Sequence, residues 1–202
     1  MKSVYLDAGH GEGVTGKYDP GAVDGVNKSE GDTIVTREND IAVDMVSRIA
    51  HLLRAKNDAA GNSNQGVNPQ HGKILGSTGD RENLFEAVRA ANALDSDLFV
   101  SIHCNSSVAA NAHGFEVFYN TEAGKRVAVL VNDAVKAGVD GIYSRGIKHN
   151  ETFYVLRKTK MTAVLIELCF ISNQADEVKI NNRKYRQALA VAISDAIWDA
   201  LV

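Results

Sequence analysis

The sequence is poor in the residues that mark disulfide scaffolds and nucleic-acid-binding proteins. Its 202 residues include only two cysteines, Cys104 and Cys169, and each stands inside an apolar run. Two such thiols in a chain of this length indicate small buried hydrophobic side chains rather than a disulfide framework. The net charge is −3, so we expect no broad cationic surface and no nucleic-acid partner.

Long apolar runs are also missing. No segment approaches the roughly 18 consecutive apolar residues that a membrane-spanning helix needs, so we expect no insertion into a membrane. The first residues, MKSVYLDAGHG, lead directly into a strand pattern. They lack the apolar core and the small-residue cleavage site of a secretory signal.

Apolar runs alternate with helical patterns along the chain, which is typical of α/β proteins. Apolar residues at helical spacing predict four helices, at 38–55, 81–94, 123–138 and 186–202. Continuous or alternating apolar runs predict strands at 3–8, 97–105, 113–120, 153–157 and 163–170, and a weak one at 73–77. The polar stretches predict loops at 11–37 and 61–72.

No repeat and no low-complexity linker divides the chain, and both prolines fall in predicted loops. We therefore predict one domain over residues 1–202. Its fold class should be α/β, with a mostly parallel or mixed central sheet and helices on both faces.

Polar residues follow three of the predicted strands at their carboxyl ends, where α/β sheets gather functional groups. The first strand ends in DAGHG, which places His10 at its tip. A later strand ends in VSIHCN with His103, and the last carries Glu167. A lone histidine in an apolar strand is usually structural, but two at strand ends of one sheet favour a shared site.

Two imidazoles and one carboxylate form a common catalytic zinc set that leaves a fourth position for water. The residues favour Glu38 as the carboxylate because it begins the first predicted helix, although an acidic side chain there also suits simple capping. Glu30, in the preceding polar stretch, is the alternative. Glu12 forms an H-x-E pattern with His10, as in zinc deaminases, but their P-C-x-x-C partner is absent.

Glu167 lies within the apolar run AVLIELCFISN. An ionised carboxylate that is buried without a partner costs several kcal/mol, so the group must be protonated, paired or directed into a cleft. Beside a dication it could act as a general acid and base, with a pKa raised by burial. The structural alternative is an ion pair with Arg145, Arg157 or Lys158.

Six blocks of the sequence, taken in order, resemble the amidase type 3 family of zinc-dependent N-acetylmuramoyl-L-alanine amidases. The blocks are LDAGHG, DPGA, ENDIAVDMVSRIAHLL, RAANALDSDLFVSIHCN, SRGIK and AVLIELCFISN. The resemblance covers nearly the whole chain. It implies His10, Glu38 and His103 as ligands of one zinc ion, Glu167 as the catalytic acid and base, and hydrolysis of the amide between N-acetylmuramic acid and L-alanine in peptidoglycan.

Two further residues are candidates for substrate contacts. Arg145 suits the carboxylates of the stem peptide because a guanidinium binds carboxylates in a planar fork, and Asn105 adjoins His103. Both also fit ordinary structural roles.

The resemblance implies action on the bacterial cell wall, as a phage endolysin or a bacterial autolysin. With no leader visible, we expect release by lysis or through a holin, or earlier removal of a leader. Two other hypotheses remain: a zinc peptidase that trims the stem peptide, and a catalytically silent module that binds peptidoglycan. Loss of a C-terminal residue would mark the peptidase, and binding without cleavage would mark the module.

Overall fold

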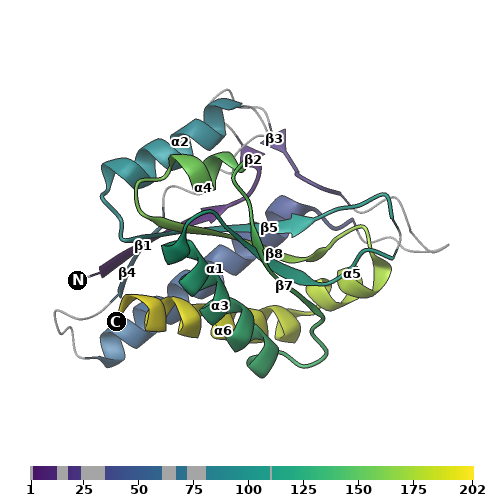
Figure 1. Ribbon diagram of the computed structural model, residues 1–202. Coiled ribbons are helices and arrows are strands. Elements are labelled where there is room, and N and C mark those ends of the chain that lie inside the picture. Colours follow the sequence, from purple (N-terminus) through teal and green to yellow (C-terminus); the bar gives the residue numbers. More distant parts are fainter. Residues whose placement is uncertain (1, 13–17, 24–34, 61–66, 72–80, 110) are drawn as a thin grey trace.

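The computed structural model describes residues 2–12, 18–23, 35–60, 67–71, 81–109 and 111–202, and its centre is a six-stranded sheet (Figure 1). The strand order is β4-β1-β5-β8-β6-β7. The first four strands in this order are parallel, β6 runs antiparallel to β8, and β7 is parallel to β6. The strands are β1 (Lys2–Ala8), β4 (Val67–His71), β5 (Leu98–Asn105), β6 (Phe115–Tyr119), β7 (Ser144–His149) and β8 (Thr162–Phe170). The predicted α/β class with a mixed sheet is confirmed.

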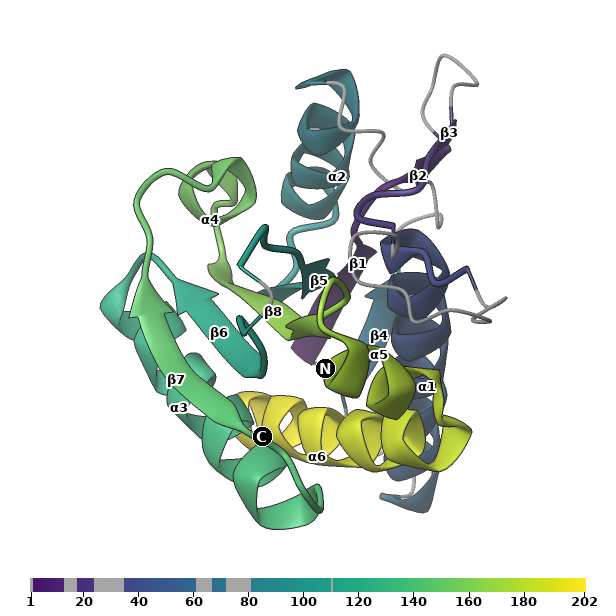
Figure 2. The same cartoon turned by 90° about the vertical axis from the view of Figure 1, so that its right-hand side faces the viewer.

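Helices cover both faces of this sheet, as predicted (Figures 1 and 2). One face packs against three long helices, α1 (Glu38–Ala59), α3 (Glu122–Gly138) and α6 (Arg183–Leu201). The opposite face packs against α2 (Arg81–Ala93) and α4 (Tyr154–Lys158). The four predicted helices are confirmed, and α3 ends at Gly138 as expected. Within the described residues, no helix combines the length and the apolar character that crossing a membrane requires.

The alternation of side chains along β8 determines where polar groups can face out. Val164 and Ile166 join the core under the long helices, whereas Ala163 and Leu165 pack on the side of α2 and α4. Successive side chains of a strand point to opposite faces. Glu167 therefore lies on the α2/α4 side, one step beyond Leu165 toward the carboxyl end.

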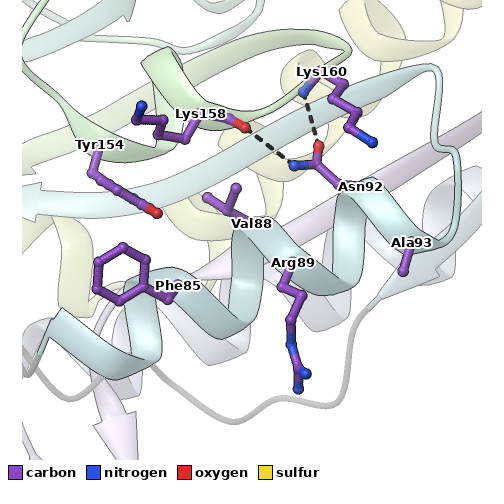
Figure 3. Close-up of a pocket in the computed structure, with 8 residues that line it drawn as sticks. All are labelled: Phe85, Val88, Arg89, Asn92, Ala93, Tyr154, Lys158 and Lys160. Atoms are coloured by element: carbon purple, nitrogen blue, oxygen red, sulfur yellow. Dashed lines mark hydrogen bonds between the residues drawn. The ribbon is translucent and has the colours of Figure 1, made fainter.

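The short helix α4 is held against α2 at the rim of a surface pocket of about 520 Å³ (Figure 3). The Asn92 side chain donates to the Lys158 carbonyl over 3.1 Å and accepts from the Lys160 amide over 2.8 Å. The rings of Phe85 and Tyr154 meet edge to face at 4.6 Å. None of the predicted site residues lines this pocket, so it belongs to the helix packing and not to the candidate site.

Two predictions of local structure are wrong. Residues 153–157 were expected to form a strand, but 154–157 belong to α4 and Phe153 is its N-cap residue. Neighbouring Val155 and Leu156 are both buried in one core cluster, which a helix allows and the alternation of a strand does not. Residues 61–72 were expected to be a loop, but 67–71 form β4 along β1, with Pro69 opposite Val4. This strand is at the sheet edge, where proline is tolerated and no apolar alternation is required.

Four further elements were not anticipated. Strand β7 lies in the SRGIK block, and helix α5 (Gln174–Asn181) follows β8. A two-stranded sheet of β2 (Gly11–Glu12) and β3 (Tyr18–Asp19) lies in the stretch expected to be irregular. Asn173 caps α5 by accepting from the amides of Ala175 and Asp176. The weak strand prediction at 73–77 lies outside the described residues.

Candidate metal centre and adjoining carboxylate

Three of the predicted residues converge at the carboxyl end of the parallel strands. His10 follows β1, Glu38 begins α1, and His103 lies near the end of β5. One ligand atom from each lies within 4.8 Å of the other two. The alternative ligand Glu30 and the side chain of Glu12 lie outside the described residues.

Two glycines make room for this convergence. A Cβ atom on Gly9 would lie 2.3 Å from the His103 ring, and one on Gly21 would lie 2.6 Å from both Glu38 and His10. Gly21 also has a φ of +69°, a left-handed conformation that glycine adopts without strain. The LDAGHG and DPGA blocks thus supply the space that the three side chains occupy.

Glu38 is the centre of the cluster. It is 4% exposed, and its Oε1 lies 2.9 Å from His103 Nδ1 while its Oε2 lies 3.2 Å from His10 Nε2. The same two oxygens accept from the amides of Cys104 and Ala22, at 3.1 and 2.8 Å. Both amides lie outside α1, so Glu38 holds the two histidines together instead of serving only as a cap of its own helix.

The electrostatics of the cluster favour positive charge. Burial alone would lower the pKa of His10, but Glu38 and then Asp19 outweigh it and raise the pKa to about 9. Burial opposes the ionisation of Glu38 as well, yet the two histidines hold its pKa well below the usual range. Glu38 also outweighs the effect of burial on His103 and raises its pKa. The site therefore stabilises a cation next to Glu38.

The far side of each imidazole is held by a further polar group. His10 Nδ1 lies 2.8 Å from Asp19 Oδ2, and His103 Nε2 lies 3.1 Å from Ser101 Oγ. Ser101 in turn donates to Asp7 over 2.7 Å. These contacts leave His10 Nε2 and His103 Nδ1 directed at Glu38. Sequence reasoning missed the three residues, although Asp19 stands in DPGA and the other two precede a histidine by two or three positions.

Glu167 lies beside this cluster on the neighbouring strand. It pairs in register with His103 of β5, and its Oε2 is buried with no hydrogen-bond partner among the described residues. Burial, reinforced by Glu38 and Glu116 and opposed by His103, raises the pKa of Glu167 to about 7. In the part of the chain that the structure describes, it forms no ion pair with Arg145, which pairs with Glu116 instead.

The two candidate substrate residues meet at a carboxylate that sequence reasoning missed. Asn105 Nδ2 donates to Glu116 Oε1 over 2.8 Å, and Arg145 Nε donates to Glu116 Oε2 over 2.6 Å. Glu116 is 2% exposed and is the second residue of β6. A charged residue within the apolar block HGFEVFYN was the available signal, of the same kind that singled out Glu167.

Comparison with known proteins connects this geometry to a family. The family model described as N-acetylmuramoyl-L-alanine amidase matches residues 4–199. N-acetylmuramoyl-L-alanine amidase LytC of Bacillus subtilis is 29% identical over 199 residues, which are 96% of this chain and 34% of LytC. The uncharacterized protein YqiI of the same organism is 33% identical, over 97% of this chain and 83% of YqiI.

A solved structure shares the fold over its full extent. The catalytic domain of CwlV, an N-acetylmuramoyl-L-alanine amidase from Bacillus (Paenibacillus) polymyxa var. colistinus, aligns with a TM-score of 0.79 at 27% identity. The alignment covers 98% of this chain and 97% of that domain. The chain thus corresponds in extent to a catalytic domain, and it spans only about a third of LytC.

Proposed function

This chain belongs to the N-acetylmuramoyl-L-alanine amidase family, and we propose that it hydrolyses the amide bond between N-acetylmuramic acid and L-alanine in bacterial peptidoglycan, with one zinc ion. The observation that carries the proposal is the convergence of His10, Glu38 and His103 with Glu167 on the next strand. The site of action would be the bacterial cell wall.

The three converging residues fit zinc. Two imidazole nitrogens and one carboxylate oxygen are a ligand set that catalytic zinc sites use, with the fourth position left for water or substrate. Ligand atoms that each lie about 2.0–2.1 Å from one tetrahedral ion are about 3.3 Å apart. The two histidines contact different oxygens of Glu38, at 2.9 Å from Oε1 and 3.2 Å from Oε2, and one ligand atom from each of the three residues lies within 4.8 Å of the other two. When bound, zinc supplies a Lewis acid that acidifies water and polarises a carbonyl group.

Glu167 would move the proton. Its carboxylate accepts a proton from the attacking water, whose oxygen forms a bond to the carbonyl carbon of the lactyl group. It then gives that proton to the L-alanine nitrogen as the C–N bond breaks, which leaves a carboxylic acid on the sugar and an amine on the peptide. The proton of the acid passes to the amine, so the products are a carboxylate and an ammonium group. In the metal-free protein, burial raises the pKa of Glu167 to about 7, above the ordinary value of a carboxyl group, which favours a group that must both accept and donate a proton.

Asp19 would orient His10 for ligation. Outer-shell partners of metal-binding histidines typically contribute about 10–100-fold to metal affinity. Replacing Asp19 by alanine should therefore weaken zinc binding by about 10–100-fold, measured by competition with a chromogenic chelator. Asp140→Ala, at an exposed carboxylate in a turn, is the control and should bind zinc like the wild type. If the wild type, Asp19→Ala and Asp140→Ala bound zinc with equal affinity, Asp19 would not orient a zinc ligand.

The direct test uses purified protein on isolated peptidoglycan, with products identified by mass spectrometry. We expect free stem peptides that begin in L-alanine, their loss after chelation and their return on addition of zinc. Release of a C-terminal residue alone would indicate a stem-peptide peptidase. Binding to peptidoglycan with no cleavage in the zinc-loaded protein would indicate a silent binding module. Either result would refute the amidase proposal.

A further inference from the structure

Three ionisable side chains form a row across the sheet. Glu167 of β8 pairs with His103 of β5 on one side and with Glu116 of β6 on the other. Paired residues on neighbouring strands present their side chains on the same face. Glu116 therefore extends the row that starts at the candidate metal centre, and the row continues to Arg145 of β7 through an ion pair.

Glu116 binds side chains from two other strands. Besides Asn105 and Arg145, the Lys148 ammonium group donates to its Oε2. The Arg145 guanidinium also lies over the ring of Phe170, 4.9 Å from its centroid. Arg145 is thus held by an ion pair and by stacking, and its long side chain has one defined direction.

The charges of Glu116, Arg145 and Lys148 do not balance at the protein surface. The one carboxylate is 3% exposed, whereas the side chains of Arg145 and Lys148 are 32% and 36% exposed. Arg145 uses Nε for Glu116 and has only a 3.4 Å contact from Nη1 to the His113 carbonyl, so Nη2 has no hydrogen-bond partner within the described part of the chain. One net positive charge, with donors available, therefore faces solvent.

We propose that Arg145 and Lys148 bind the free carboxylate of the second residue of the stem peptide, and that Glu116 is the residue that positions them. The inference rests on the proposed amidase function and adds a substrate preference to it. β7 is two strands away from β8, which corresponds to about 10 Å. An extended peptide spans about 3.3–3.6 Å per residue, so the carboxylate bound here lies within about three residues of the scissile amide.

The competing explanation is an ion-pair network that only stabilises the sheet. Such a network would affect all substrates equally. A carboxylate subsite instead discriminates between substrates that differ in a single charge, because charge-assisted hydrogen bonds are stronger than neutral ones. The ratio of rates on two such substrates therefore separates the two explanations.

The test uses two synthetic N-acetylmuramoyl tripeptides that differ only at the second peptide residue, D-glutamate in one and D-isoglutamine in the other. The zinc-loaded wild type should show a kcat/KM about 10-fold or more higher on the carboxylate form. Arg145→Gln and Lys148→Gln should reduce this ratio toward one by raising KM on the carboxylate substrate. Glu116→Gln should reduce the ratio as well, with unchanged zinc content. Lys125→Gln, at an exposed cation of α3, is the control and should retain the wild-type ratio.

Equal wild-type rates on both tripeptides, with intact peptidoglycan still cleaved, would overturn the subsite and leave the amidase proposal standing. Variants at Arg145, Lys148 and Glu116 that slow both substrates equally would also overturn it, in favour of a structural network. If the wild type cleaves neither the tripeptides nor peptidoglycan, the amidase proposal fails and this inference fails with it.

Discussion

Replacing Glu167 by glutamine should lower kcat by roughly 10²–10⁴-fold, the usual contribution of a positioned acid–base group. Glutamine keeps the shape of the side chain but can neither accept a proton from water nor deliver one to the leaving nitrogen. Zinc content should stay at one ion per chain, because the candidate ligands are three other residues, His10, Glu38 and His103.

The fold of this variant should be intact. The pKa of Glu167 is raised from 4.5 to about 7, so its ionisation costs stability as pH rises through that range. Glutamine removes this cost, and thermal unfolding at pH 8 should therefore occur at the same temperature as in the wild type or higher. Glu122→Gln, at an exposed carboxylate of α3, is the matched control and should have full activity.

The pH dependence tests the same assignment. Glu167 must be ionised to accept a proton, so wild-type kcat/KM should fall with decreasing pH once the carboxylate becomes protonated. In the metal-free protein the pKa of Glu167 is about 7, and a bound dication shifts this limb to lower pH. If Glu167→Gln retained near-normal activity, Glu167 would not be the acid–base group. The same would hold if the variant had the full rate and the same fall in kcat/KM at low pH as the wild type.

The second large effect is expected at Glu38. Glu38→Gln should reduce bound zinc from about one ion per chain to near zero under conditions that saturate the wild type, and activity should fall to background. The substitution removes the negative charge that lies between His10 and His103 at 3.2 and 2.9 Å. The neutral amide is a far weaker ligand for zinc than a carboxylate.

In the absence of metal, Glu38→Gln should also be less stable than the wild type, within a defined range of pH. The pKa of Glu38 is depressed in the folded protein, so its stabilising contribution is present above its ordinary value of 4.5 and is lost as pH falls. The pKa of His10 is raised from 6.5 to about 9, so its contribution is present below 6.5 and is lost as pH rises through about 9. The difference in melting temperature between the metal-free wild type and metal-free Glu38→Gln should therefore be largest between about pH 4.5 and 6.5, and it should shrink as the pH falls below 4.5 or rises toward about 9.

Two further variants test whether Glu38 is the carboxylate ligand of zinc. Glu86→Gln, at a partly exposed carboxylate of α2 that pairs with Arg89, should leave zinc binding unchanged. Glu30→Gln tests the alternative ligand in the same assay, and we expect it to retain the ion. Full zinc binding by Glu38→Gln together with loss of zinc by Glu30→Gln would transfer the ligand role to Glu30.

The long helices could be predicted because each shows one apolar face at a period of 3.6 residues, and that face packs on the sheet. Apolar runs predicted β1, β5, β6 and β8 for a similar reason, since their side chains fill the core on one or both faces. Strand β4 and helix α4 were predicted wrongly. Strand β4 is an edge strand defined by its pairing with β1. Helix α4 has only five residues, which is too short for a helical period to be recognised in the sequence.

The sequence alone determined the chemistry available to this protein: two histidines at strand ends, a carboxylate at the start of the first helix and a glutamate inside an apolar strand. Those residue types are local features, and they can be read without knowing what lies next to them. Only the tertiary structure decided which groups share one site. It placed Glu38 between His10 and His103, put Asp19 and Ser101 behind the imidazoles, and aligned Glu116 with Glu167 across β6 and β8. The contacts of Glu38 with the two histidines and the pairing of Glu116 with Glu167 join segments far apart in the chain, so they depend on how the helices and strands pack together and not on any one local pattern of residues.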